Sequence, residues 1–164
     1  MEAIFELLAD IPIFADLSNS DLEKVAKLLK AETYERGDTI VHEGQVADRF
    51  LIVRTGLVDV LRPGERSDAL LFTIEPGGHF GEAALAGQFP RTASVRARRT
   101  SLLFSLSHAA FQQLLAEDPA IGAKVLVRIV TELLDRLRHT SGELVTVLVE
   151  GSSLSPDAVS RLVR

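Results

Sequence analysis

Hydrophobic residues recur with different spacings along the chain, and the changes of spacing divide it into zones. In residues 1–30 they recur at helical spacing. Pro12 interrupts this pattern after a first short segment, and Ser18 then stands where the N-cap of a second segment is expected. We therefore predict an N-terminal helical segment made of two packed helices.

Residues 31–106 instead show short apolar runs separated by glycine-containing turns. The runs predict strands at Glu32–Glu35, Thr39–His42, Arg49–Arg54, Leu57–Arg62, Ala69–Ile74, Ala93–Ala97 and Leu102–Leu106. Turns are predicted at Arg36–Asp38, Glu43–Gly44, Thr55–Gly56, Pro63–Glu65 and Pro76–Gly78. Turn signals about every 8–12 residues are typical of antiparallel sandwiches and jelly rolls. The predicted fold class is mainly β, an antiparallel β jelly roll with N-terminal helices and a long C-terminal helix.

Residues 107–150 return to helical spacing. Ser107 is expected to cap one helix, and Asp118 followed by Pro119 to begin the next. In that second helix apolar residues recur every four positions, at Ile121, Val125, Ile129, Leu133 and Leu137.

A polar stretch interrupts the apolar pattern of this helix at residues 138–143 before it resumes. If continuous, the helix spans roughly 33 residues, or about 50 Å. Because this exceeds the size of a small barrel, we predict a homodimer through residues 121–148. Residues 151–164 are expected to be a C-terminal tail or the start of a further domain.

The composition is that of a folded domain without thiol chemistry. The chain has 164 residues, of which 46% are hydrophobic and 25% charged, and it has no cysteine. This excludes a disulfide scaffold, a thiolate metal site and a cysteine nucleophile. The acidic start is unlike a signal peptide, and no apolar run has bilayer length. A cytoplasmic protein with no membrane partner is expected.

Charge is distributed unevenly. Residues 1–90 hold 8 Lys/Arg against 16 Asp/Glu, a net charge of −8, whereas residues 91–164 hold 10 against 7, a net charge of +3. A total of −5 argues against non-specific nucleic-acid binding by the whole chain, because affinity for the phosphate backbone needs a basic face. We therefore expect no nucleic-acid binding by this chain alone, while a local pocket for a small anion stays open.

Candidate chemistry is concentrated in Gly78–Leu85 and the nearby Pro90–Val95. Gly81 and Glu82 open a short helical turn, whose free N–H groups favour an anion. The Glu82 carboxylate can accept a hydrogen bond from a hydroxyl, and Arg91 supplies a planar fork suited to a phosphate. A ligand that needs both groups is a ribose phosphate.

This stretch resembles the phosphate-binding cassette of the cyclic nucleotide-binding domain family, which includes catabolite activator protein and the regulatory subunits of protein kinase A. The resemblance covers about residues 10–145 and includes Phe50–Val60, which is similar to the family's strand–glycine–strand hairpin. It implies that Glu82 binds the ribose 2′-hydroxyl and Arg91 the cyclic phosphate. It also implies a sensor and not an enzyme, with cAMP as the expected ligand, cGMP as the alternative and no further cofactor.

The resemblance also indicates which residues contact the nucleotide. In the cassette they are expected to be Phe80, Gly81, Glu82, Ala83, Ala84, Arg91, Thr92 and Ala93. A threonine at position 92 occurs in relatives of both base preferences, so it does not choose the base. On the long helix Arg136 and Thr140 are candidates for contacts with the purine.

Other interpretations stay open. The cassette could be vestigial, in a nucleotide-independent dimerisation or interaction module. The chain could also be the sensor part of a Crp/Fnr-type transcription regulator without its DNA-binding domain, and a downstream effector domain or partner protein is not identified. A metal centre is not expected, because the four histidines, at positions 42, 79, 108 and 139, include no pair one residue apart.

Overall fold

The computed structural model describes residues 2–64 and 68–151. It divides into two compact units, one up to Leu126 and one from Val127 onward, and each is described by itself. The first unit contains the helices and strands that precede the long C-terminal helix.

The N-terminal segment forms helices, as its periodicity predicts. Helix α1 spans Glu2–Ala9, a 3-10 helix spans Pro12–Phe14, and α2 spans Asn19–Leu28. Ser18 caps α2 through a reciprocal pair of hydrogen bonds with Asp21, of 3.2 Å to the Ser18 hydroxyl and 3.1 Å to the Asp21 carboxylate. The predicted N-cap is therefore confirmed.

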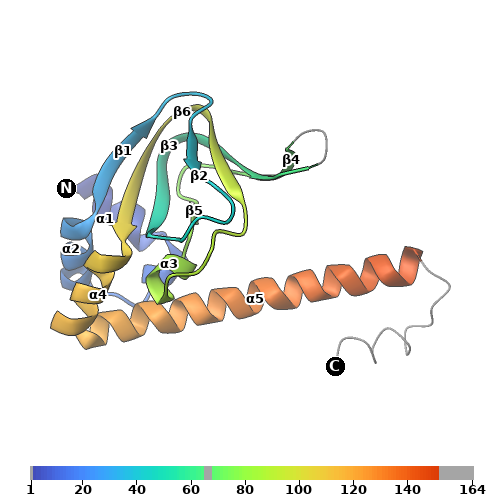
Figure 1. Cartoon of the computed structure of the whole chain (residues 1–164). Coiled ribbons are helices and arrows are strands. Elements are labelled where there is room, and N and C mark those ends of the chain that lie inside the picture. Colours follow the sequence, from blue (N-terminus) through green and yellow to red (C-terminus); the bar gives the residue numbers. More distant parts are fainter. Residues whose placement is uncertain (1, 65–67, 152–164) are drawn as a thin grey trace. The chain divides into compact units, whose positions relative to one another are not determined.

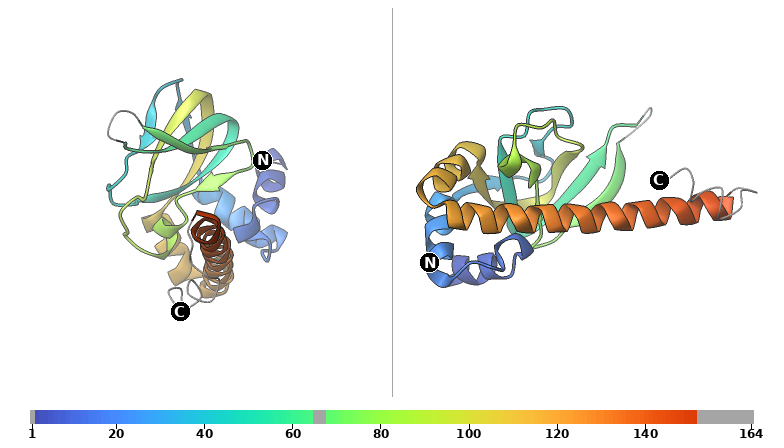
Figure 2. Two further views of the ribbon diagram at one scale, coloured as in Figure 1. Left: turned by 90° about the vertical axis from the view of Figure 1, so that its right-hand side faces the viewer. Right: turned by 90° about the horizontal axis from the view of Figure 1, so that it is seen from below.

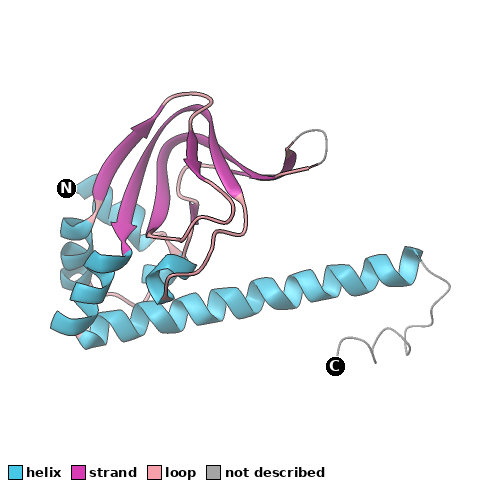
Figure 3. Ribbon diagram, in the orientation of Figure 1, coloured by secondary structure: helices cyan, strands magenta, loops and turns pink. Residues whose placement is uncertain are grey.

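The strands pair in an antiparallel sheet, as predicted. They are β1 (Lys30–Tyr34), β2 (Thr39–Val41), β3 (Arg49–Arg62), β4 (Ala69–Ile74), β5 (His79–Phe80) and β6 (Ser94–Ser107). The order is β1-β6-β3-β4, with β2 paired to β6 and β5 to β3. The strands curl around a common interior, as Figures 1 and 3 show.

Two long strands replace four of the predicted short ones. Strands β3 and β6 have 14 residues each and pair along their whole length, from Arg49 opposite Ser107 to Leu61 opposite Ser94. The turn predicted at Thr55–Gly56 and the strand–glycine–strand hairpin were therefore wrong. Gly56, with φ of +95°, lies where the pairing register shifts, and the strand continues beyond it.

The need for glycine at position 56 is steric. A Cβ there would lie 2.6 Å from the Cα atom of Ser101 on β6, which is closer than real Cβ atoms approach backbone. Glycine at position 56 thus allows β3 and β6 to approach closely, whereas its place between two apolar runs predicted a turn. The short strand β5 was also not predicted.

Buried aliphatic side chains fill the interior of the sheet. They include Leu51, Val53 and Val58 from β3 and Val95 and Leu103 from β6. The helices add a second apolar layer, in which Phe14 meets Phe50 of β3 edge to face with ring centroids 6.1 Å apart. In both orientations of the molecule α1, α2 and α4 lie at the same end of the sheet (Figures 1 and 2).

The remaining helices begin close to the residues that the sequence predicts. Helix α3 spans Ala83–Ala86, α4 spans His108–Glu117 and α5 spans Pro119–Gly151. The Ser107 hydroxyl accepts a hydrogen bond of 3.1 Å from the N–H of Ala110 and so caps α4. Helix α5 has 33 residues and is continuous through the polar stretch 138–143. Across the described ranges, no helix combines the length and apolar character that crossing a bilayer requires.

Candidate functional site

Gly81 connects the short strand β5 to α3 and brings the chain close to Arg91. Its φ of +80° is in the left-handed region, which glycine adopts without strain. A Cβ at this position would lie 2.2 Å from Nη1 of Arg91 and 3.0 Å from the carbonyl oxygen of Arg49. Any larger residue at position 81 would displace the Arg91 guanidinium.

Arg91 is held at both its backbone and its side chain. Its N–H donates to the Gln45 carbonyl over 2.7 Å, and its own carbonyl accepts from the N–H of Gly44 over 2.9 Å. Its Nη2 donates to the Arg49 carbonyl over 2.7 Å and lies 3.5 Å from the Asp48 carboxylate. These contacts fix the guanidinium through one of its two terminal nitrogens.

The other terminal nitrogen of Arg91, Nη1, has no hydrogen-bond partner among residues 2–64 and 68–151, although it is buried. The side chain as a whole is only 6% exposed. A buried donor without an acceptor costs about 1–3 kcal/mol, and more when the group is charged. The guanidinium is therefore oriented and ready to donate to an anion.

Burial and the neighbouring charges have opposite effects on the Arg91 guanidinium. Burial lowers the pKa of Arg91, because the cation loses its hydration, and the positive charge of Arg49 lowers it further. The carboxylates of Asp48 and Glu82 oppose this effect and stabilise the cation. Glu82 is itself buried, with 7% exposure, and precedes the first turn of α3. The structure thus brings Gly81, Glu82 and Arg91 together.

The other predicted contact residues have varied surroundings. Phe80 and Ala84 are buried, and Ala93 packs partly buried against the core. The side chain of Thr92 is exposed, and its carbonyl accepts a hydrogen bond of 3.4 Å from Nη2 of Arg62. Ala83 is half-buried in the first turn of α3.

The two candidate purine contacts belong to the second unit. Arg136 is exposed and pairs with Glu132, one turn earlier on α5, over 2.5 Å. The side chain of Thr140 lies outside the part of the chain whose side chains are described. Their contact with a purine stays a prediction.

Sequence reasoning missed three residues that surround the predicted pair. Asp48 and Arg49 contact Arg91 as described above. His108, the first residue of α4, donates its N–H to the Asp48 carbonyl and joins its Nδ1 to the Ala84 carbonyl, both over 2.7 Å. An acidic–basic pair before a strand is too common to single out, so no sequence signal marked them.

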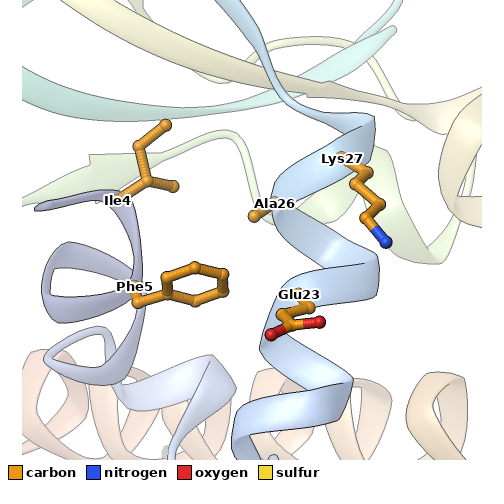
Figure 4. Close-up of a pocket in the computed structure, with 5 residues that line it drawn as sticks. All are labelled: Ile4, Phe5, Glu23, Ala26 and Lys27. Carbon is orange, nitrogen blue, oxygen red and sulfur yellow. The ribbon is translucent and has the colours of Figure 1, made fainter. Parts of the chain in front are cut away.

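The structure also has a cavity of about 240 Å³ between α1 and α2. Figure 4 shows Phe5 of α1 pointing toward α2, with Ile4 beside it and Glu23, Ala26 and Lys27 on the facing helix. None of these residues belongs to the cassette. Within the described ranges, no group of three or more His, Asp or Glu side chains is arranged to hold a metal ion.

Comparison with known protein families gives one family match. A sequence profile of the cyclic nucleotide-binding domain matches residues 31–118, which contain the sheet and the Arg91 site. The chain is 33% identical over 108 residues to the cAMP-dependent protein kinase regulatory subunit of Yarrowia lipolytica, covering 66% of this chain and 28% of that protein. It is 36% identical over 133 residues to the potassium/sodium hyperpolarization-activated cyclic nucleotide-gated channel 3 of Mus musculus, covering 81% and 16%.

Solved structures show the same fold. A cyclic nucleotide-binding domain from Methylobacillus flagellatus superimposes with a TM-score of 0.75 and 26% identity, covering 94% of this chain and 85% of that one. The N-terminal domain of a transcriptional regulator from Streptomyces coelicolor superimposes with a TM-score of 0.72 and 29% identity, covering 84% of this chain and 94% of that one. The chain thus spans about a quarter of the kinase regulatory subunit and most of these single-domain structures.

Proposed function

The chain belongs to the cyclic nucleotide-binding domain family, and from this premise we propose that it binds cAMP through Arg91 and Glu82 and acts as a sensor. The observation that carries the proposal is Nη1 of Arg91, a buried donor without a partner in the described part of the chain. A cyclic phosphate is a monoanion whose two free oxygens suit a guanidinium fork. Bound there, it would supply the missing acceptor.

Glu82 is proposed to bind the sugar. Its carboxylate is buried close enough to Arg91 to stabilise the cation, so both groups can address one small ligand. A carboxylate is an acceptor only, which suits the 2′-hydroxyl of a ribose and not a phosphate. A nucleotide with the hydroxyl is therefore expected to bind more tightly than its 2′-deoxy analogue.

We also propose that the domain reports binding through its helices. His108 joins the start of α4 to α3 in the cassette and to Asp48 beside Arg91. Helix α4 is followed directly by α5, so a shift of the cassette could change the position of both helices. A ligand that binds one arrangement better than another shifts the population between them. The relatives named above include a regulatory subunit of a cAMP-dependent protein kinase and a cyclic nucleotide-gated channel.

Titration calorimetry of the whole chain with cAMP, cGMP and 2′-deoxy-cAMP tests the proposal. We expect cAMP to bind, and the 2′-deoxy analogue to bind more weakly. Arg91→Ala should weaken cAMP binding by about 30- to 5,000-fold, because the truncation leaves the phosphate without its counter-charge, a loss of about 2–5 kcal/mol. Arg91→Lys should recover only part of this, because a point charge does not replace the fork.

Glu82→Gln separates the sugar from the phosphate. It keeps the shape of the side chain and loses the charge-assisted hydrogen bond, so cAMP affinity should fall by about 1.5–3 kcal/mol and the difference between cAMP and its 2′-deoxy analogue should shrink. A folded wild-type protein that binds neither cAMP nor cGMP would contradict the proposal and favour a vestigial cassette. Mass spectrometry of nucleotides released on mild denaturation checks beforehand that the site is empty.

A further inference from the structure

Side chains of alternating charge lead from the edge of the sheet to the Arg91 site. The Glu32 carboxylate on β1 lies 3.3 Å from Nη1 of Arg49, and Nε of Arg49 lies 3.8 Å from the Asp48 carboxylate. Asp48 in turn lies 3.5 Å from Nη2 of Arg91. In this series only Asp48 lies between the Arg49 side chain and the Arg91 guanidinium, which is proposed to bind phosphate.

The outer end of this series is fixed to the sheet. Glu32 accepts hydrogen bonds from the hydroxyls of Tyr34 and Ser105, the former over 2.6 Å. Burial alone would raise the pKa of Glu32, but these hydrogen bonds and the charge of Arg49 lower it below its ordinary value. Glu32 is therefore an ionised and well-positioned partner for Arg49.

Arg49 contacts the proposed phosphate site at two points. Its backbone carbonyl accepts the hydrogen bond from Nη2 of Arg91, and its side chain shares the Asp48 carboxylate with Arg91. Its Nε is buried and has no hydrogen-bond partner within the described part of the chain. Its side chain keeps 31% exposure, so its charge is only partly screened.

From these contacts we infer that Arg49 is a positioning residue for Arg91. By pairing with Asp48, Arg49 keeps this carboxylate from neutralising the Arg91 guanidinium, which is proposed to bind phosphate. The inference rests on the proposed function, because it concerns the same anion site. With Arg49 present, Asp48 is divided between two cations. Without it, Arg91 would be the one ion-pair partner left to Asp48 among the described residues, and Asp48 would compete with the phosphate. Arg49 also adds a positive charge near the ligand.

Calorimetry with cAMP on charge-matched variants tests this inference. Arg49→Gln should weaken binding by about two- to fivefold, since Arg91 itself stays in place and the Asp48 carboxylate is largely exposed. Arg49→Lys keeps the charge but has no planar fork, so its affinity should fall between those of Arg49→Gln and wild type. The control is Arg54→Gln, which removes one positive charge from the same strand, five residues after Arg49. This variant should bind cAMP like wild type.

A double-mutant cycle with Asp48→Asn gives a readout that loss of fold would not produce. If Arg49 acts through Asp48, Arg49→Gln should have a smaller effect on affinity in the Asp48→Asn background. Equal binding by Arg49→Gln and Arg54→Gln would overturn the inference, and so would an undiminished effect in that background. Equal losses of affinity and melting temperature in Arg49→Gln and Arg49→Lys would also overturn it and show a structural role. If wild type itself binds no cyclic nucleotide, the proposed function fails first, which distinguishes the two outcomes.

Discussion

At the scale of single residues, two acids connect the polar groups near the site: Glu32, which is partly buried, and Asp48, which is exposed. The motif residues Gly81, Glu82 and Arg91 could be predicted, because their types and spacing carry chemistry that is visible in the sequence. Asp48 and Arg49 could not. They reach Arg91 because the segment that leads into β3 is hydrogen-bonded to residues 89–91, a contact between parts of the chain that are far apart in sequence.

Tyr34 offers a direct test of the Glu32 cluster, because it is the protein's one tyrosine and the chain has no tryptophan. Burial, and then the hydrogen bond and charge of Glu32, raise the pKa of Tyr34 to about 12. Its phenolate absorbance should therefore appear near pH 12 in the folded protein. In Glu32→Gln the midpoint should move part of the way toward about 10, the ordinary value, because burial, the largest cause, remains.

The same shift predicts a loss of stability in alkali. The unfolded chain releases the tyrosine proton at a lower pH than the folded chain, so the contribution of Tyr34 is complete below about pH 10 and is lost as pH rises toward the folded value. Glu35→Gln serves as the control for Glu32→Gln. It removes a carboxylate close to the same strand, but that carboxylate accepts a hydrogen bond from Thr100. A wild-type midpoint near 10 in the folded protein would contradict the observed contact between Tyr34 and Glu32.

At the scale of elements, helices were easier to predict than strand boundaries. Caps such as Ser18 and Ser107 act locally, and their hydrogen bonds are made within three residues. Gly56 differs, because its role depends on Ser101, a residue far along the chain. Glycine between two apolar runs fits a turn equally well, so only the pairing partner distinguishes a turn from a close approach of two strands.

Two glycines with the same φ allow the close approach at Gly56 to be measured. Gly37 and Gly56 both have φ of +95°, but a Cβ at Gly37 would meet nothing within 4 Å. The free energy of unfolding of Gly37→Ala should therefore fall only by the cost of a left-handed residue, about 1–2 kcal/mol. Gly56→Ala should lose a further 1–3 kcal/mol or so, because the Cβ overlaps Ser101.

Equilibrium unfolding in urea gives both differences in the free energy of unfolding. Equal losses in the two variants would show that β3 and β6 are farther apart at this point than the structure places them. A larger loss for Gly56→Ala would confirm that the long strands require glycine there.

At the scale of the whole molecule, α5 exposes an apolar surface within the described part of the chain. Val127, Val130, Leu134 and Leu137 are each between 49% and 63% exposed, and Leu133 is 41% exposed. The first four are spaced by three, four and three residues, which is the repeat of a helix–helix seam. Monomeric proteins rarely expose a continuous apolar stripe of this kind.

We propose that this stripe pairs with its counterpart in a second copy of the chain, as the homodimer prediction requires. Full burial of an exposed leucine contributes about 1.5–3 kcal/mol, and Leu134 and Leu137 still expose about half of their surface, so the double variant Leu134→Gln/Leu137→Gln removes about 3–7 kcal/mol from a symmetric dimer. Static light scattering should therefore show a dimeric wild type and a monomeric double variant at the same concentration. Asp135→Gln is the control, because helical geometry places residue 135 on the other side of α5 from the stripe, and it should stay dimeric. A wild type that is monomeric at high micromolar concentration, with and without cAMP, would refute the dimer and leave the stripe to another partner.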